Sequence, residues 1–511
     1  MLRLKVYYGH IRNHKELCEQ LGIDKALPRA AREEAIILAA YEKWGEDCAN
    51  HFHGMFAFVI ENEDGSLFLC RDHFGTVPLY YYETADGRLL AATTIRELME
   101  GEGFEKSLNL KMLQIYLTMT YTTGDETFFT GVRKLLPGRF MTYKNGKKEI
   151  TRYWRPQFAP DENKSLEEWA NEINSTLSAV MTEVKSEDEY VESFLSGGVD
   201  SSYVLAVSDA TACNSCGYDD SRLDESGLAR QTADILGRKF NRCLITPEEY
   251  FSAVPYVMYN MEQPLGDASA VAFAIGCRAT AEHTDICYSG EGADEFFGGY
   301  NMYRNADRYG ENLHDFYVGN TNIMKEEEKR RLLKKYFDNF EPIDLVRDIY
   351  KENEGLDPLS KMTDVDIQVW LEGDIYLNVN KMSRAAGLEV RMPLTDRRIF
   401  DIAARIPSRY KVNDEQNKVA LRTAAAKVLP EDIAFRKKLG FVVPIRMWMA
   451  DERYNSDVRA KLSSDFAAEF FNLDEVNAIF EEYIGGNSDN WRKIYVIYTF
   501  LVWYEEYFIK R

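Results

Sequence analysis

The chain has 511 residues, which is too long for a single hydrophobic core, so two or three domains are expected. Its 45% hydrophobic and 28% charged residues exclude global disorder. A net charge of −21 excludes nucleic acid as a general partner, because a phosphate backbone is bound through an excess of Lys and Arg. No apolar run approaches membrane-spanning length, and residues 1–5 lack the apolar core of a signal peptide, so we expect a cytoplasmic protein without membrane contact.

The eight cysteines are scattered along the chain, as in proteins of a reducing compartment. Cys213 and Cys216 have the C-x-x-C spacing of zinc sites and redox pairs. No second C-x-x-C or H-x-H follows, and the segment lies where the next strand of a nucleotide-binding domain belongs. The pair is therefore interpreted as structural.

Residues 1–156 have the pattern of an antiparallel sheet with a few helices. Tight-turn dipeptides with Gly second, flanked by apolar runs, predict three β-hairpins at Asp64-Gly65, Asp86-Gly87 and Asn145-Gly146. Ahead of these hairpins, residues 34–41 have helical composition and spacing. The pattern predicts an α+β domain built on antiparallel sheet.

A polar, proline-bearing stretch at residues 155–164 is the expected linker to a second domain, residues 157–511. A capping box, Ser165-x-x-Glu168, opens a helix directly after it. From about residue 190 a strand, a Gly-rich turn and a helix repeat, which predicts a doubly wound parallel sheet that binds a nucleotide and carries many helices.

Residues 194–202 change from an apolar strand to small residues before a helical run. This arrangement makes an anion cradle, because unpaired backbone N–H groups and the helix dipole converge there. A carboxylate beside phosphates needs a divalent cation between them, so Asp200 is predicted to bind Mg²⁺. For S-G-G alone, the alternative is an ordinary strand-to-helix turn. The small residues of the cradle are Ser196, Gly197, Gly198, Ser201 and Ser202.

A second short strand, residues 284–288, ends in a similar turn, S-G-E-G-A-D-E at residues 289–295. Ligands of open α/β sheets bind where the carboxyl ends of strands meet, so the two turns should face each other across one site. Beyond Tyr300 the chain is expected to be mostly helical. The charged run at residues 325–335 is expected to be a solvated helix face, and the aromatic tail at 491–507 is expected to pack in the core.

Five sequence blocks now stand in order along the second domain. Together they resemble the synthetase domain of the glutamine-dependent asparagine synthetases. The resemblance implies that ATP and aspartate form β-aspartyl-AMP, which ammonia attacks to give asparagine. The blocks are S-G-G-V-D-S-S at 196–202, S-G-E-G-A-D-E-F-F-G-G-Y at 289–300, N-K-M-S-R-A-A-G-L-E-V-R-M-P-L at 380–394, K-x-x-L-R at 418–422 and R-K-K-x-G-F at 436–441.

The resemblance also assigns the nucleotide site. Residues 196–202 match the pyrophosphate loop, Leu195 and Cys216 match positions beside the adenine and ribose of ATP, and Ser289 and Gly290 match positions that contact the nucleotide. Asp200 and Asp294 resemble the paired Mg²⁺ ligands, since two carboxylates can neutralise one hard cation. The alternative for Asp294 is a helix cap.

Two catalytic residues follow from the same matches. Glu291 is expected to accept a proton as nitrogen attacks, and Lys418 to offset charge that builds on the α-phosphate and the carbonyl oxygen. The alternative for Lys418 is a solvent-facing helix lysine. Arg391 is interpreted as structural, paired with Glu389.

The N-terminal domain resembles the glutaminase domain of the same family, but only from its middle onward. That domain uses a cysteine at residue 1, whose own α-amino group is the base, whereas position 2 here is Leu and Cys18 lies mid-chain. A start upstream of Met1 is the alternative explanation. The blocks of likeness are residues 6–13, 54–58, 71–81 and 136–138.

Two further sites depart from the glutaminase pattern. The family's N-G-E reads Tyr8-Gly9-His10, and the glutamine-binding Asp of its S-D-T-E is at best Glu33. We therefore predict an incomplete, degenerate glutaminase-like domain without glutaminase activity, and free or partner-supplied ammonia as the nitrogen source. A truncated antiparallel layer exposes strand edges, which a homodimer contact or a partner is expected to cover.

Alternative functions stay open at this point. The chain is either an asparagine synthetase or a related acyl-adenylate ligase that joins another carboxylate to another amine. The N-terminal half is in addition a candidate non-catalytic interaction module. In β-lactam synthetases a Tyr stands at the position of Glu291 and a Glu at that of Leu377, and this chain has neither. This absence supports an asparagine-type site over that cyclase without excluding other acids. Residues 262–270 also resemble the family's D-E-P block, which borders the acid pocket.

Overall fold

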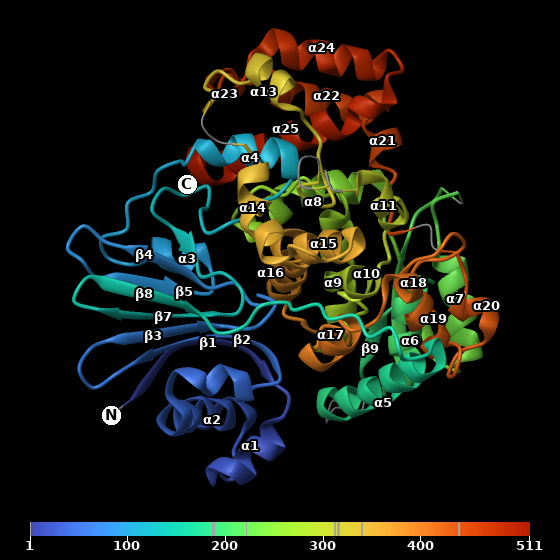
Figure 1. The fold of residues 1–511 in the computed structure, drawn as a ribbon. Coiled ribbons are helices and arrows are strands. Elements are labelled where there is room, and N and C mark those ends of the chain that lie inside the picture. The colour runs from blue at the N-terminus through green and yellow to red at the C-terminus, as the bar shows by residue number, and fades with distance from the viewer. Residues whose placement is uncertain are drawn as a thin grey trace. The chain divides into compact units, whose positions relative to one another are not determined.

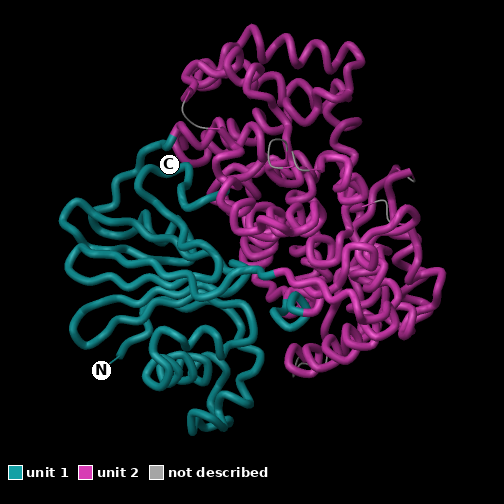
Figure 2. The backbone as a smooth tube through the Cα atoms, in the orientation of Figure 1, with its two compact units in different colours: residues 1–109, 123–157, 396–401 teal, residues 110–122, 158–395, 402–511 magenta. Residues whose placement is uncertain are grey.

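The computed structural model describes residues 2–185, 190–220, 222–310, 313, 317–338, 341–437 and 440–510. Met1, the questioned start, and Lys438 of the R-K-K block lie outside the described residues. The chain forms two compact units, shown in different colours in Figure 2. Unit 1 comprises Met1–Asn109, Thr123–Gln157 and Asp396–Asp401, and unit 2 comprises Leu110–Thr122, Phe158–Thr395 and Ile402–Arg511.

Unit 1 contains the antiparallel sheet structure predicted for the N-terminal region. One sheet has the strand order β1-β2-β3-β7-β8 and the other β5-β4-β6, and every pairing in them is antiparallel (Figure 1). The strands are β1 (Arg3–Ile11), β2 (Gly54–Glu61), β3 (Leu67–Arg71), β4 (Tyr80–Glu83), β5 (Leu89–Ala92), β6 (Arg133–Lys134), β7 (Arg139–Lys144) and β8 (Lys147–Arg152).

The three predicted hairpins are confirmed, because β2 pairs with β3, β4 with β5 and β7 with β8. Asn145 and Gly146 have φ values of 51° and 73°, the left-handed pair that a two-residue hairpin turn requires. The predicted helix lies within α2. The helical elements of unit 1 are α1 (His14–Leu21), α2 (Arg29–Trp44), the 3₁₀ helix η1 (Gly45–His51) and α3 (Ile95–Met99).

The central strands β2 and β3 of the larger sheet of unit 1 are buried on both faces. One face packs against α1 and α2 through residues such as Ile36, Phe56 and Phe68. The other face packs against the smaller sheet, where Leu69 and Tyr81 belong to one buried cluster. Alternate strand residues therefore serve two cores, which explains the nearly continuous apolar runs of β2 and β3.

Unit 2 is built on a parallel sheet with the strand order β11-β10-β9-β12-β13. All its pairings are parallel, which confirms the predicted C-terminal fold. Helices α6, α7 and α9 pack against its strands. The strands are β9 (Glu192–Phe194), β10 (Ala212–Gly217), β11 (Lys239–Leu244), β12 (Ile286–Tyr288) and β13 (Glu389–Arg391).

Helices make up most of the remainder of unit 2, and α17 (Arg397–Ala403) begins in unit 1 and ends in unit 2. Those that surround the sheet are α5 (Leu166–Val184), α6 (Val199–Val207), α7 (Ser226–Ile235), α8 (Pro247–Met261), α9 (Ser269–Ala281), α10 (Ala293–Phe297), α16 (Leu377–Ala386), α18 (Ser408–Lys411), α19 (Val419–Ala425) and α20 (Glu431–Ala434). The others are α4 (Lys111–Met119), η2 (Asn301–Asn305), α11 (Ala306–Tyr309), α13 (Glu326–Leu332), α14 (Ile343–Glu352), α15 (Pro358–Val365), η4 (Asp366–Tyr376), α21 (Ile445–Trp448), α22 (Glu452–Leu462), α23 (Ala467–Phe470), α24 (Leu473–Ile484), η5 (Ser488–Asn490), α25 (Trp491–Tyr504) and η6 (Glu505–Ile509).

Two of the local predictions for unit 2 are confirmed, and a third is wrong at one residue. The capping box of Ser165 and Glu168 is present, and the aromatic tail forms α25, which is buried from Ile494 to Trp503. The expectation that the 325–335 run is solvated is wrong at Lys329, whose Nζ is buried and donates to the Gln114 carbonyl oxygen. Within the described part of the chain, no helix has the length and apolar character needed to cross a membrane.

Candidate active site

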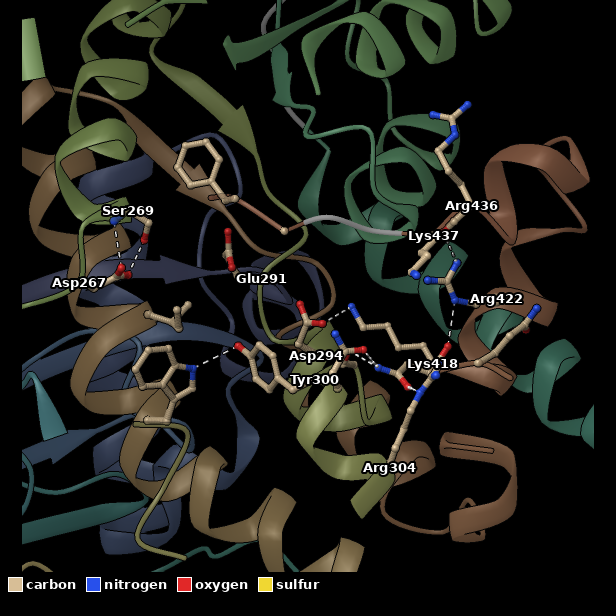
Figure 3. Close-up of a pocket in the computed structure, with 18 of the residues that line it drawn as sticks. Asp267, Ser269, Glu291, Asp294, Tyr300, Arg304, Lys418, Arg422, Arg436 and Lys437 are labelled. Carbon is tan, nitrogen blue, oxygen red and sulfur yellow. Dashed lines mark hydrogen bonds and ion pairs between the residues drawn. The ribbon is translucent and has the colours of Figure 1, made fainter. Parts of the chain in front are cut away.

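A cleft of about 820 Å³ opens in unit 2, beside the turn that follows β12. Figure 3 shows the side chains around it, which come from that turn, from α9, from the start of α19 and from the segment after α20. Its charged and polar walls include Glu291, Asp294, Tyr300, Lys418, Arg422 and Arg436.

The turns that follow β9 and β12 lie against each other, as the sequence predicts. The two strands are neighbours, with Tyr288 opposite Ser193. A Cβ atom placed on Gly290 would lie 2.9 Å from the backbone nitrogen of Ser201. Only glycine allows this close approach, which brings Asp200 next to the 289–295 turn.

Lys418 joins the two predicted metal ligands. Its Nζ lies 2.6 Å from Oδ2 of Asp200 and 2.7 Å from Oδ1 of Asp294, and its side chain is 2% exposed. The solvent-facing alternative for this lysine is therefore wrong. Gly299 makes the arrangement possible, because a Cβ there would lie 2.1 Å from Lys418 Cε. Asp294 does not cap α10, whose N-cap is Gly292.

Hydrogen bonds between nearby residues order the predicted pyrophosphate loop. The backbone N–H of Ser196 donates to Ser201 Oγ at 3.1 Å, and Gly197 takes a left-handed φ of 79°. Arg436 Nη1 donates to the Gly197 carbonyl oxygen at 3.3 Å. The R-K-K block marks this arginine in the sequence but does not reveal its contact with Gly197. Ser201 and Ser202 are buried in the first turn of α6, next to Asp200.

Glu291 projects toward the cleft (Figure 3) and is held from two sides. Ser289 Oγ donates to its Oε1 at 3.2 Å, and Thr395 Oγ1 donates to its carbonyl oxygen at 3.0 Å. The Thr395 hydroxyl also lies 2.8 Å from the hydroxyl of Tyr376. Neither Thr395 nor Tyr376 was found from the sequence, since no local pattern shows which chain segment lies behind the turn.

Other predicted nucleotide contacts lie outside the walls of this cleft. These contacts are residues 195–198, 200–202 and 289–290, which lie behind residues of the cleft wall. Asp200 contacts Lys418, Ser289 contacts Glu291, and Gly197 contacts Arg436. Leu195 is 2% exposed, and Cys216 is half-buried. Cys213 and Cys216 have different partners, the carbonyl oxygens of Lys239 and Ala272, which agrees with the structural interpretation of the C-x-x-C spacing.

A buried polar network supports the cleft on the side of Tyr300. Its hydroxyl donates to Glu295 Oε1 at 2.6 Å and accepts from Trp370 Nε1 at 3.1 Å. Burial raises the pKa of Glu295 to about 8. Away from the cleft, Arg391 donates to Glu389 and to the Val184 carbonyl oxygen, so its structural interpretation is confirmed.

Asp200 and Asp294 fit a hard divalent cation. Both carboxylates already approach one positive charge, the Lys418 ammonium, and carboxylate oxygens are the donors that Mg²⁺ prefers. No group of three or more His, Cys, Asp or Glu that could hold a metal occurs among the described residues. Mg²⁺ needs no such group when substrate phosphates complete its coordination.

Unit 1 contains a different buried carboxylate. Oε1 of Glu33 accepts from the Ile11 backbone N–H at 3.2 Å and lies 3.3 Å from His10 Nδ1 and 3.4 Å from Arg29 Nε. Its Oε2 accepts from the Tyr7 hydroxyl at 3.0 Å. His10 and Glu33 are two of the positions at which the sequence departs from the glutaminase pattern, and they contact each other.

Comparisons with known proteins match both units. The family model for asparagine synthase matches residues 172–505, and that for the glutamine amidotransferase domain matches residues 3–154. The chain is 31% identical to the glutamine-hydrolyzing asparagine synthetase 1 of Bacillus subtilis, over 98% of this chain and 85% of that protein. It is 28% identical to a putative glutamine-hydrolyzing asparagine synthetase of Mycobacterium tuberculosis, over 98% and 84%. It is also 29% identical to amidase chyE of Penicillium rubens, over 61% and 49%.

Proposed function

Because the chain belongs to the asparagine synthase family, we propose that it uses ATP to activate aspartate as aspartyl-AMP and then forms asparagine with ammonia. The family supports an ATP-dependent amidating ligase, and the acid and the nitrogen source are our proposal. The observation that carries it is the position of Lys418 between Asp200 and Asp294, in the same cleft as Glu291.

In the first half-reaction, a carboxylate oxygen of the acid attacks the α-phosphorus of ATP and pyrophosphate leaves. The backbone N–H groups and hydroxyls of residues 196–202 bind the pyrophosphate, and Lys418 offsets charge on the α-phosphate. Arg436 keeps the loop in place through Gly197. Mg²⁺ held by Asp200 and Asp294 would neutralise charge on the leaving pyrophosphate.

In the second half-reaction, ammonia attacks the acyl carbon, and AMP leaves with the electron pair of the broken C–O bond. The attacking nitrogen must lose a proton, and Glu291 is the carboxylate in the cleft that accepts it. Lys418 stabilises the oxyanion of the tetrahedral intermediate. Ser289 and Thr395 hold Glu291 in position for this step.

We further propose that unit 1 does not hydrolyse glutamine, although it belongs to the amidotransferase domain family. This chain has His10 at the position where the glutaminase family has a carboxylate that binds the amino group of glutamine. The nearby Glu33 is already bound to His10, Arg29, Tyr7 and the Ile11 N–H. A glutamine amino group would have to displace one of these donors, so free or partner-supplied ammonia is the nitrogen source.

Pyrophosphate release by the purified chain tests both proposals. ATP and Mg²⁺ are supplied with aspartate, glutamate or other carboxylic acids, and with either ammonium or glutamine. We expect pyrophosphate and asparagine from aspartate with ammonium, and no glutamate from glutamine. Equal pyrophosphate release without aspartate would refute aspartate as the acid, and glutamate release would refute the proposal for unit 1.

A second candidate is an amidating ligase that acts on another acid. It is favoured by the likeness to amidase chyE of Penicillium rubens and to amidase chry2 of Gibberella zeae, each 29% identical over the matched region. Pyrophosphate release with another carboxylic acid and not with aspartate would select this candidate.

A further inference from the structure

Two cysteines lie side by side on neighbouring strands of unit 2. β10 and β11 run parallel, and Cys216 is in register with Cys243. Residues in register on neighbouring strands point to the same face of the sheet, so the two thiols lie next to each other. Neighbouring strands lie about 4.8 Å apart, which is within the Cα separation that a disulfide bridges. The sequence does not reveal this pair, because the C-x-x-C spacing suggests Cys213 as the partner of Cys216 and gives no sign that Cys243 is its neighbour.

Cys216 and Cys243 also differ from the other cysteines in access. Both are partly exposed, whereas Cys213, Cys277 and Cys287 of the same unit are buried. The neighbouring Cys216 thiol lowers the pKa of Cys243, and the neighbouring Cys243 thiol together with burial raises the pKa of Cys216. The thiolate is the nucleophilic form, so Cys243 is the thiol that reacts first.

We propose that Cys216 and Cys243 are a redox-sensitive modification site that forms a reversible disulfide at the edge of the nucleotide-binding region. The oxidant is a peroxide. The Cys243 thiolate attacks one peroxide oxygen, breaks the O–O bond and becomes a sulfenic acid, and hydroxide leaves. Cys216 then attacks the sulfenic sulfur and water leaves. In total, two thiols and one hydrogen peroxide give one disulfide and two waters.

The site connects to the cleft through helix α9, which packs closely on Cys216. The Cys216 thiol donates to the Ala272 carbonyl oxygen at 3.8 Å, and a Cβ on Gly276 would lie 2.7 Å from its sulfur. The same helix carries Ser269 and Phe273, which line the cleft. A disulfide draws the Cys216 sulfur toward β11 and away from α9, so oxidation changes the packing that supports one wall of the cleft.

Peptide mapping tests the disulfide without reference to the proposed function. The full chain is treated with hydrogen peroxide, free thiols are alkylated, and peptides are mapped by mass spectrometry without reduction. We expect one cross-linked pair that joins Cys216 to Cys243 and disappears with dithiothreitol. If the treated chain instead carries Cys243 as sulfinic acid, or joins Cys216 to another cysteine, the modification site is refuted.

Equilibrium binding of a fluorescent ATP analogue tests the connection to the cleft, and this part rests on the proposed function. Oxidation should raise Kd by about fivefold or more, and dithiothreitol should restore it. Cys243→Ala should bind the analogue normally and no longer respond to peroxide. The matched control Cys213→Ala, on β10 with Cys216, should keep the cross-link and the response. A cross-linked chain with unchanged Kd would refute the connection while leaving the disulfide in place.

Discussion

Each unit holds a carboxylate beside cationic side chains, but the two clusters differ in their surroundings: that of unit 2 borders a cleft, whereas Glu33 of unit 1 is enclosed by its partners. In unit 1, Glu33 is 4% exposed and its contacts are with Tyr7, His10, Ile11 and Arg29. A carboxylate has about four acceptor sites, so the unit's own donors fill them. This cluster stabilises the fold and has little capacity left for a ligand.

The cluster in unit 2 shares one cation between two carboxylates at the wall of an open cleft. Asp200 and Asp294 both contact Lys418, and both Asp294 and Lys418 line the cleft. A charged side chain beside an open cleft can bind a substrate, whereas a charged side chain enclosed by its own partners cannot. Burial of a charged group is therefore weaker evidence for a site than the space beside it.

Lys418→Met gives the largest expected effect. The change removes the cation that offsets charge in both half-reactions, so kcat/KM for pyrophosphate release should fall by about 100-fold to 1,000-fold. The control is Lys329→Met, which removes another buried lysine of unit 2 and should lower Tm with little change in kcat/KM. Comparable rate losses in the two variants would show that Lys418 is structural.

Glu291→Gln should separate the two half-reactions. Amide formation is expected to fall by about 100-fold, because the proton acceptor is lost, while exchange of pyrophosphate into ATP falls less. Glu415→Gln changes an exposed carboxylate of the same cleft and should leave both rates within about twofold. An equal loss in the two half-reactions would assign Glu291 to substrate binding instead of proton transfer.

Glu33→Ala should affect stability and not catalysis. Buried donors lose their acceptor, so the free energy of unfolding measured in urea should fall by about 2 kcal/mol, with ammonia-dependent activity unchanged. Glu34→Ala, at the exposed neighbouring position of α2, should change stability by less than about 0.5 kcal/mol. A fall in ammonia-dependent activity of the folded Glu33→Ala protein would contradict the separation of the two clusters.

The pH dependence of unit 1 gives the smallest expected effect. Burial, with nearby Arg397, lowers the pKa of His73 from 6.5 to about 3. The unfolded chain therefore binds more protons between these values, and stability is lost as pH falls below 6.5. His73→Gln should reduce the loss between pH 6 and pH 5 by about 1 kcal/mol, as measured in urea. Equal losses in both proteins would show that His73 is protonated in the fold.

The elements of both units follow from local sequence signals. Asn145 and Gly146 adopt the left-handed conformations that a tight hairpin turn requires, and the Ser165 capping box begins a helix where predicted. The neighbouring turns after β9 and β12 also follow from topology, since ligands of such sheets collect at one switch point. The family resemblance predicts a role for Lys418 in the site. Helical spacing alone would predict a solvent-exposed lysine at this position.

Long-range partners are what the sequence did not reveal. Thr395 lies behind Glu291 although the two are far apart in the chain, and Arg436 holds Gly197 from a segment that lacks regular structure. The register of Cys216 with Cys243 depends on which strands become neighbours. Such contacts depend on packing between distant segments, which neither periodicity nor composition encodes.

The backbone of Lys418 shows a conflict between folding and chemistry. It has φ 57° and ψ 38°, a left-handed conformation that costs an ordinary residue about 1 kcal/mol or more, and it stands at the N-cap of α19. Glycine would relieve this strain but would remove the ammonium between the two carboxylates. Selection for stability alone would favour glycine here, so the lysine indicates that function has outweighed the local gain in stability.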